Sequence, residues 1–158
     1  MATETVDADR VEQFANDLRG TVVRPDDPEY DDARAVWNGV IDRYPAAIAR
    51  CHGVADVRAA LAFARETDLP VSVRGGGHNV SGSAVCDDGL VVDCSEMRAV
   101  SVEPDARTVW VQAGATWADV DHETQAFGLA TPGGVVSDTG VAGLTLGGGI
   151  GHLRCRYG

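Results

Sequence analysis

The chain has 158 residues, 44% of them hydrophobic, and a chain of this size buries one core, so we expect a single domain. Its 24 acidic and 13 basic residues give a net charge of −11, and the basic residues are all arginine, which argues against nucleic-acid binding because phosphate backbones need a basic surface. No apolar run is long enough to span a membrane and residues 1–10 are polar and acidic, so we expect a cytoplasmic protein without membrane contact.

Three stretches carry apolar side chains three and four residues apart, which predicts helices over residues 8–18, 30–43 and 56–67. The third is the clearest, and Leu69-Pro70 ends it. The second would bury one face, made of Ala33, Val36, Trp37 and Ile41.

Short β-branched runs predict strands at residues 71–73 and 90–93. Residues 100–102 and 109–113 alternate apolar and polar side chains around the turn Pro104-Asp105, which predicts a β-hairpin. Helices and strands are therefore mixed along the chain, and no linker divides it.

The last predicted helix begins at Thr116, whose hydroxyl can cap it together with Asp119 three residues later. This helix would run to about Phe127 and stop at Gly128, because glycine favours the backbone conformation that ends helices.

The segment Arg74–Asn79, with the sequence Arg-Gly-Gly-Gly-His-Asn, carries the strongest chemical signal. Successive free N–H groups in a glycine turn form a concave site for phosphate oxygens, and Arg74 would add a positive charge beside it. His78 would then lie next to whatever group the phosphates carry. A plain strand-ending turn with a surface histidine is the simpler alternative.

A second glycine-rich segment covers residues 140–151 and cannot form one regular helix or strand throughout. Two such loops, about 65 residues apart, suit one long ligand with phosphate and ring portions. Neither fits the Rossmann fingerprint, because the third required glycine falls on Val80 or on His152. The chain also lacks the lysine of a Walker A loop, so a nucleotide here needs another architecture.

Further motifs occur in a fixed order between residues 20 and 158. They are Arg24-Pro25, Tyr30, Ala33-Arg34, Trp37-Asn38, Pro45, Asp56-Val57, Arg74–Asn79, Gly114–Trp117, Phe127–Leu129 and Gly147–Gly151. This ordered set resembles the N-terminal flavin-binding region of the FAD-linked oxidases that include berberine bridge enzyme.

The resemblance implies an α+β fold of the PCMH type, the vanillyl-alcohol-oxidase-like FAD-binding fold, with small mixed sheets flanked by helices. Residues 1–20 would be an N-terminal helix and extension, and residues 21–158 an incomplete FAD-binding domain. It also implies that the Arg74–Asn79 loop holds the FAD pyrophosphate and that His78 is bonded covalently to the 8α-methyl carbon of the flavin. Val136 stands where some relatives have a second, cysteinyl link, so a single attachment is implied. The implied cofactor-binding residues are Arg74, Gly75, Gly76, Gly77, His78, Asn79, Gly82, Ser83, Asp138, Thr139, Gly140, Gly143, Gly147, Gly148 and Gly149.

The family's enzymes continue beyond this region with a substrate domain and catalytic bases, so no catalytic residue is assigned. In the full-length protein a small-molecule substrate would give hydride to FAD, and O₂ would reoxidise it. We expect a truncated reading frame, a fragment, or a half that needs a complementary chain or C-terminal half. Two alternatives stay open: a degenerate module that binds FAD without catalysis, and a flavin reductase with noncovalent FAD and NADPH as donor.

The remaining reactive side chains are given no role. The four cysteines (51, 86, 94 and 155) show no metal-ligand spacing, so we expect buried small hydrophobes and no metal. His52, His122 and His152 have no carboxylate or cysteine partner at ligand spacing. The acids are spread along the chain, which favours the solvated surface of a halophilic protein, the alternative being an acidic protein from a GC-rich genome.

Overall fold

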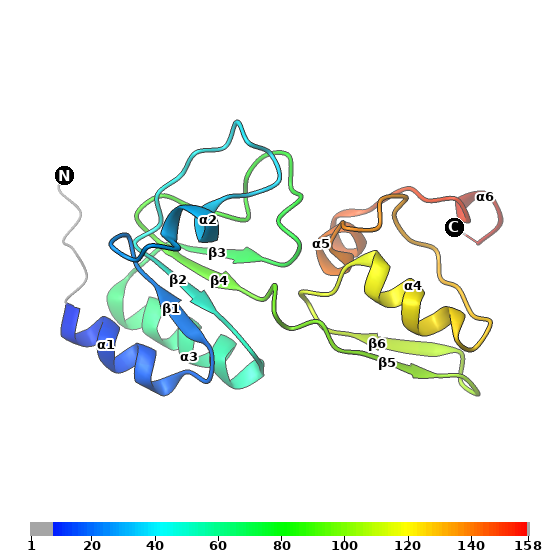
Figure 1. Ribbon diagram of the computed structural model, residues 1–158, viewed down its shortest axis with the longest axis horizontal. Helices are drawn as coiled ribbons and strands as arrows, with labels where there is room; N and C mark the ends of the chain where they lie inside the picture. The colour runs from blue at the N-terminus through cyan, green and yellow to red at the C-terminus, as the bar shows by residue number, and fades with distance from the viewer. Residues whose placement is uncertain (1–7, 158) are drawn as a thin grey trace.

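The computed structural model describes residues 8–157 and arranges them as two groups of elements side by side (Figure 1). The first group contains α1 (Ala8–Asp17), β1 (Thr21–Val23), α2 (Tyr30–Arg34), β2 (Ala47–Arg50), α3 (Val54–Thr67), β3 (Val71–Arg74) and β4 (Leu90–Asp93). The second contains β5 (Val100–Glu103), β6 (Thr108–Val111), α4 (Trp117–Gln125), α5 (Val141–Gly147) and α6 (Arg154–Tyr157). None of these helices has the length and apolar character needed to cross a bilayer.

The first group is built on a four-stranded sheet with the order β1-β2-β4-β3. β4 pairs in parallel with both β2 and β3, while β1 is antiparallel to β2. All four residues of β4 are buried, as expected of a central parallel strand covered on both faces. The carboxyl ends of β3 and β4 lie next to each other, with Arg74 opposite Asp93, so the first glycine loop begins at one edge of this sheet.

Helices cover both faces of that sheet, because successive side chains of a strand point to opposite sides. Leu90 and Val92 of β4 pack with residues of α1 and α3, whereas Val91 packs with residues of α2. Helix α1, predicted as part of an extension, contributes to this core, since Phe14 stacks on Phe63 of α3 with ring centroids 4.3 Å apart.

Asp56 ties the start of α3 to the strand connections around it. Its buried carboxylate accepts hydrogen bonds from the backbone N–H groups of His52, at 2.8 Å, and Arg19, at 3.1 Å. Burial alone would raise the pKa of Asp56, but these N–H donors outweigh it and hold the pKa below its ordinary value. The carboxylate therefore stabilises this corner of the fold in its charged form.

The second group confirms the predicted hairpin and the predicted helix cap. β5 and β6 are antiparallel, and α4 packs on β5. The Thr116 side chain and the Asp119 side chain satisfy each other's backbone N–H groups in a capping box. Arg98 reinforces the cap with a bidentate ion pair to Asp119, in which the atoms approach to 2.8 Å.

The helix predicted over residues 30–43 is wrong beyond Arg34, because a side chain of strand β3 ends it. The Ala33 carbonyl, which the N–H of Trp37 would need in a continuing helix, accepts instead from the buried guanidinium of Arg74. Ala35 then takes an extended conformation, and the Trp37 N–H donates to the Gly77 carbonyl at 3.2 Å. The chain from residue 35 to 44 is consequently a loop that lies against the first glycine turn.

Candidate functional site

The two glycine-rich segments meet in a cleft lined by residues of both groups of elements, with a volume of about 370 Å³. The first group supplies Val73, Gly75, Gly76, Gly77, His78, Asn79, Ser83 and Ala84 to its lining. The second group supplies Thr139, Gly140, Gly143, Leu144, Gly147 and Gly148. Segments about 65 residues apart thus form one site, as the ligand interpretation of the sequence requires.

Within the lining of the cleft, Gly76 and Gly140 bring the two loops together through their backbones. A Cβ added at Gly76 would lie 2.5 Å from the nitrogen of Gly140, and one added at Gly140 would lie 2.6 Å from the nitrogen of Gly76. The second loop is held there by hydrogen bonds from the Trp117 N–H to the Thr139 carbonyl, at 3.1 Å, and from the Val141 N–H to the Ala115 carbonyl, at 2.9 Å. Glycine at 76 and 140 is therefore a condition for the two loops to approach this closely.

Other glycines of the lining face open space instead. A Cβ at Gly77, Gly143, Gly147 or Gly148 would meet nothing within 4 Å apart from the adjoining chain or, in α5, the helix's own backbone. Gly77 and Gly148 also have positive φ values, 70° and 84°, which side-chain-bearing residues rarely adopt. These positions leave bare backbone facing the cleft, and this is the arrangement that an extended cofactor with phosphates needs for close approach.

The imidazole of His78 lies at the wall of this cleft, with its side chain about 20% exposed. Its ring stacks on Trp37, with centroids 5.4 Å apart and planes 20° from parallel. The Nε2 atom lies 3.8 Å from a carboxylate oxygen of Asp138, which lies just before the second glycine-rich segment. His78 is thus the one residue of the lining with a nucleophilic ring nitrogen, and it is held between two segments.

The turn that follows His78 is organised by the Asn79 side chain. Its oxygen accepts hydrogen bonds from the Ser81 N–H, at 2.9 Å, and from the Ser81 hydroxyl, at 2.6 Å. The N–H of Ser83 approaches the same oxygen at 3.5 Å. Asn79 therefore shapes the loop as an Asx turn and keeps Ser83 on the cleft lining.

Arg74 does not play the predicted part, because its side chain turns away from the glycine turn. The guanidinium is buried under α2, where it donates to the carbonyls of Ala33 and, at 3.2 Å, of Arg34. Burial lowers the pKa of Arg74, and the Asp93 carboxylate 3.8 Å away opposes that effect. The prediction that the Arg74 charge faces the phosphate site is wrong, and the cleft lining contains no arginine.

Two further predicted glycines stand behind the lining and pack against it. A Cβ at Gly82 would lie 2.7 Å from the Cγ2 atom of Ile41, and one at Gly149 would overlap the side chain of Leu144. Leu144 itself lines the cleft. Gly82 and Gly149 therefore support the site through packing, and a Cβ at either position would require the side chain of Ile41 or Leu144 to move.

Two of the side chains that were given no role behave differently from expectation. His52 does have a carboxylate partner, since its Nε2 lies 2.5 Å from a carboxylate oxygen of Glu96. The two residues meet because they lie in the connections that follow the neighbouring parallel strands β2 and β4. Cys51 and Cys94 are buried as predicted, whereas Cys155 is exposed, because the short helix that carries it has no buried face.

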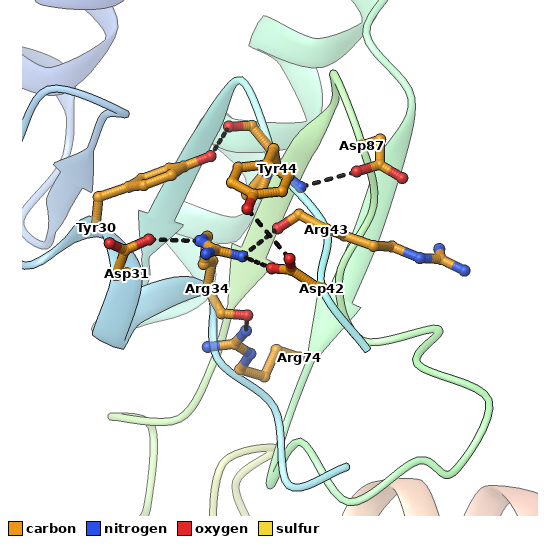
Figure 2. A network of polar contacts seen from close by, with 9 residues as sticks. Tyr30, Asp31, Arg34, Asp42, Arg43, Tyr44, Arg74 and Asp87 are labelled. Carbon is orange, nitrogen blue, oxygen red and sulfur yellow. Dashed lines mark hydrogen bonds and ion pairs between the residues drawn. The ribbon is translucent and has the colours of Figure 1, made fainter. Parts of the chain in front are cut away.

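A polar network that the sequence did not indicate surrounds Arg34, at the end of α2 (Figure 2). Its guanidinium pairs with Asp31 at 2.8 Å and with Asp42, donates to the Arg43 carbonyl at 3.2 Å, and lies 4.1 Å from the centre of the Tyr44 ring. The hydrogen bond from Arg34 holds the pKa of Asp42 below its ordinary value. The network joins the start of the 35–44 loop to its end.

Comparison with known proteins identifies the family of this chain. The family described as the FAD binding domain matches residues 45–158. The chain is 40% identical over 136 residues to an FAD-linked oxidoreductase of Bacillus subtilis, covering 86% of this chain and 30% of that protein. It is 35% identical over 141 residues to the (R)-6-hydroxynicotine oxidase of Paenarthrobacter nicotinovorans, covering 89% of this chain and 31% of that protein.

Solved structures agree with these relatives. The crystal structure of 6-hydroxy-D-nicotine oxidase from Arthrobacter nicotinovorans superposes with a TM-score of 0.87 at 35% identity, over 89% of this chain and 31% of that one. A berberine-bridge-enzyme-like protein of Physcomitrella patens gives 0.88 at 28% identity, over 94% and 33%. The predicted fold of the PCMH type is confirmed, and the chain spans about a third of the length of the relatives it matches.

Proposed function

The chain belongs to the FAD binding domain family, and on that premise we propose that it holds FAD in the cleft between its glycine loops through a covalent bond to His78. The backbone N–H groups of Gly75 to Gly77, with Ser83, would hold the pyrophosphate. Thr139, Gly140 and Gly143 would hold the flavin or its ribityl chain. When bound, FAD supplies the redox chemistry, taking hydride from a small-molecule substrate and passing electrons to O₂.

The observation that carries this proposal is the place of His78 within the cleft. The histidine directly follows the glycine turn and lines the cleft, together with Gly77 and Gly143, where an added Cβ would meet open space. A ring nitrogen with a free lone pair is a nucleophile, so an electrophilic carbon of a ligand held in this cleft would be within its reach. Val136 cannot form a thioether, so His78 would be the single attachment point.

The test is the release of flavin by acid. The chain is loaded with FAD, precipitated with acid, washed and run on a denaturing gel, where the protein band should fluoresce. The variant His78→Ala should lose the fluorescent band and retain reversible FAD binding. His122→Ala, on α4, is the matched control and should keep the band. A wild-type chain that releases all its flavin into the acid would refute the covalent bond, and would favour the alternative of a reductase with noncovalent FAD.

A second function, an FAD-holding module without catalysis of its own, is favoured by the composition of the lining. The lining contains one side chain with acid–base chemistry, His78, and the proposal uses it to hold the cofactor. Proton abstraction from a substrate needs a further positioned base. We propose that a C-terminal half or a complementary chain supplies the substrate-binding site and the base, since the relatives are about three times as long.

An oxygen electrode separates the two functions. The 158-residue chain loaded with FAD should consume no oxygen when alcohols, sugars or amines are added. Substrate-dependent oxygen uptake that His78→Ala removes would make this chain an enzyme by itself.

A further inference from the structure

The imidazole of His78 is held from two sides by residues that are far apart in the sequence. Trp37 belongs to the 35–44 loop of the first group, and its ring stacks on the imidazole. Asp138 belongs to the segment before α5 in the second group, and its carboxylate lies 3.8 Å from Nε2. The ring plane and the charge environment of His78 are therefore set by different parts of the fold.

The loop that carries Trp37 is bonded to the backbone on both sides of His78. The Trp37 N–H donates to the Gly77 carbonyl at 3.2 Å, and the Asn38 side chain donates to the Val80 carbonyl at 2.8 Å. These two hydrogen bonds fix the position of the loop relative to residues 77–80. The Trp37 ring consequently cannot slide along the glycine turn without breaking them, although it is itself 64% exposed.

The Arg34 network in turn fixes both ends of the same loop (Figure 2). Arg34 precedes the loop, and its guanidinium is bonded to Asp42 and to the Arg43 carbonyl near the loop's other end. Arg74 holds the carbonyl of Arg34 from below at 3.2 Å. The chain of contacts runs from the sheet through α2 to Trp37 and then to His78, so an exposed aromatic ring is held in one place.

We propose that Trp37 and Asp138 are positioning residues for the attachment of flavin to His78. Trp37 would fix the plane of the imidazole, and Asp138 would stabilise the positive charge that develops on it as the new bond forms. This inference rests on the covalent attachment proposed above.

The attachment forms a bond between a ring nitrogen of His78 and the 8α-carbon of the flavin. The imidazole N–H and one methyl C–H each give up a proton. O₂, as the oxidant, would take up these two protons and the two electrons and leave as hydrogen peroxide, so atoms and electrons balance. The charge on the imidazole is largest while the nitrogen–carbon bond is forming, and a carboxylate a few ångströms away lowers the energy of that stage.

The size of each effect follows from the geometry. Two unit charges at this separation attract even in water enough to change a rate about fivefold, and more where the cofactor excludes water. Loss of the stacking ring lets the imidazole rotate away from its reactive orientation, and misplacement by about an ångström can cost up to about a hundredfold in rate. Asp138→Asn should therefore slow attachment about fivefold or more, and Trp37→Ala about tenfold or more.

The test follows acid-stable flavin with time at saturating FAD, in air, in the 158-residue chain. Trp37→Phe and Asp138→Glu should recover most of the rate, because they restore the ring or the charge. Trp110→Ala, an exposed tryptophan of β6, and Asp105→Asn, in the hairpin turn, are matched controls and should attach flavin at the wild-type rate.

A second readout needs no flavin. In the NMR spectrum of the apoprotein, the ring protons of His78 should be shifted by the stacked indole, and Trp37→Ala, but not Trp110→Ala, should remove that shift. The positioning role would be overturned by wild-type attachment rates in both Trp37→Ala and Asp138→Asn. It would also be overturned if the chemical shifts of the His78 ring protons were the same in Trp37→Ala as in the wild type. A wild-type chain with no acid-stable flavin would instead overturn the covalent attachment itself.

Discussion

Replacing Gly76 by alanine would put a methyl group against the backbone of Gly140, where the two loops of the cleft touch. The new carbon would lie 2.5 Å from the Gly140 nitrogen and 2.6 Å from its Cα atom, whereas ordinary van der Waals contact begins at 3.4 Å. The neighbouring atoms belong to the backbone, so no side chain can rotate away. The two loops would have to separate by about 0.9 Å.

The expected cost comes from that separation. Overpacking in a well-packed region typically costs about 1–3 kcal/mol. For a chain of this length such a loss lowers the melting temperature by roughly 2–12 °C. FAD binding should weaken as well, because the cofactor would bridge both loops. If the bound state loses this energy in addition to the loss in the free chain, the dissociation constant rises between about fivefold and about 150-fold.

Thermal unfolding followed by circular dichroism and titration of flavin fluorescence measure the two effects. Gly53→Ala is the matched control, since a Cβ there meets nothing within 4 Å and φ is −173°, which any residue adopts. It should leave both quantities close to wild type. A Gly76→Ala variant with the melting temperature and the FAD affinity of the wild type would show that the two loops do not meet at this point.

Three further predictions address the site and its frame. Mass spectrometry of the flavin-loaded chain should find one flavopeptide, containing His78; a cysteinyl-flavin peptide would contradict the placement of Val136 at the position of the second link. The depressed pKa of Asp56 contributes stability that is present at neutral pH and lost as the pH falls through the folded-state value, below the ordinary 3.8. Asp56→Asn should therefore lower the melting temperature at pH 7 and flatten its fall in acid, and an unchanged acid slope would refute this account. Burial raises the pKa of Cys51 to about 12, so iodoacetamide at pH 8 should label exposed Cys155 and spare Cys51 until the chain unfolds; equal labelling of the two in the folded chain would contradict the packing.

Local sequence patterns were sufficient for most of the elements. The strands at residues 71–74 and 90–93 follow from β-branched runs, and the hairpin follows from alternation around Pro104-Asp105. The cap at Thr116 follows from a carboxylate three residues later. Each depends on neighbours along the chain, so each could be predicted before the fold was known.

The helix over residues 30–43 shows where that reasoning fails. Its apolar spacing is helical, yet Arg74 takes the carbonyl of Ala33 and ends the helix at Arg34. No pattern within the segment predicts a hydrogen-bond donor from a strand about 40 residues away in the sequence. Trp37, expected in the core, is consequently exposed and stacks on His78.

The sequence by itself determined the two glycine loops, the histidine beside the first, and the family to which they belong. Only the tertiary structure decided that Arg74 faces the sheet and α2 instead of the cleft, and that Trp37 and Asp138 meet His78. Glycine and strand patterns record what the local backbone can do. The direction of an arginine side chain and the neighbours of an imidazole depend on which distant carbonyls, rings and carboxylates the folded chain brings within reach.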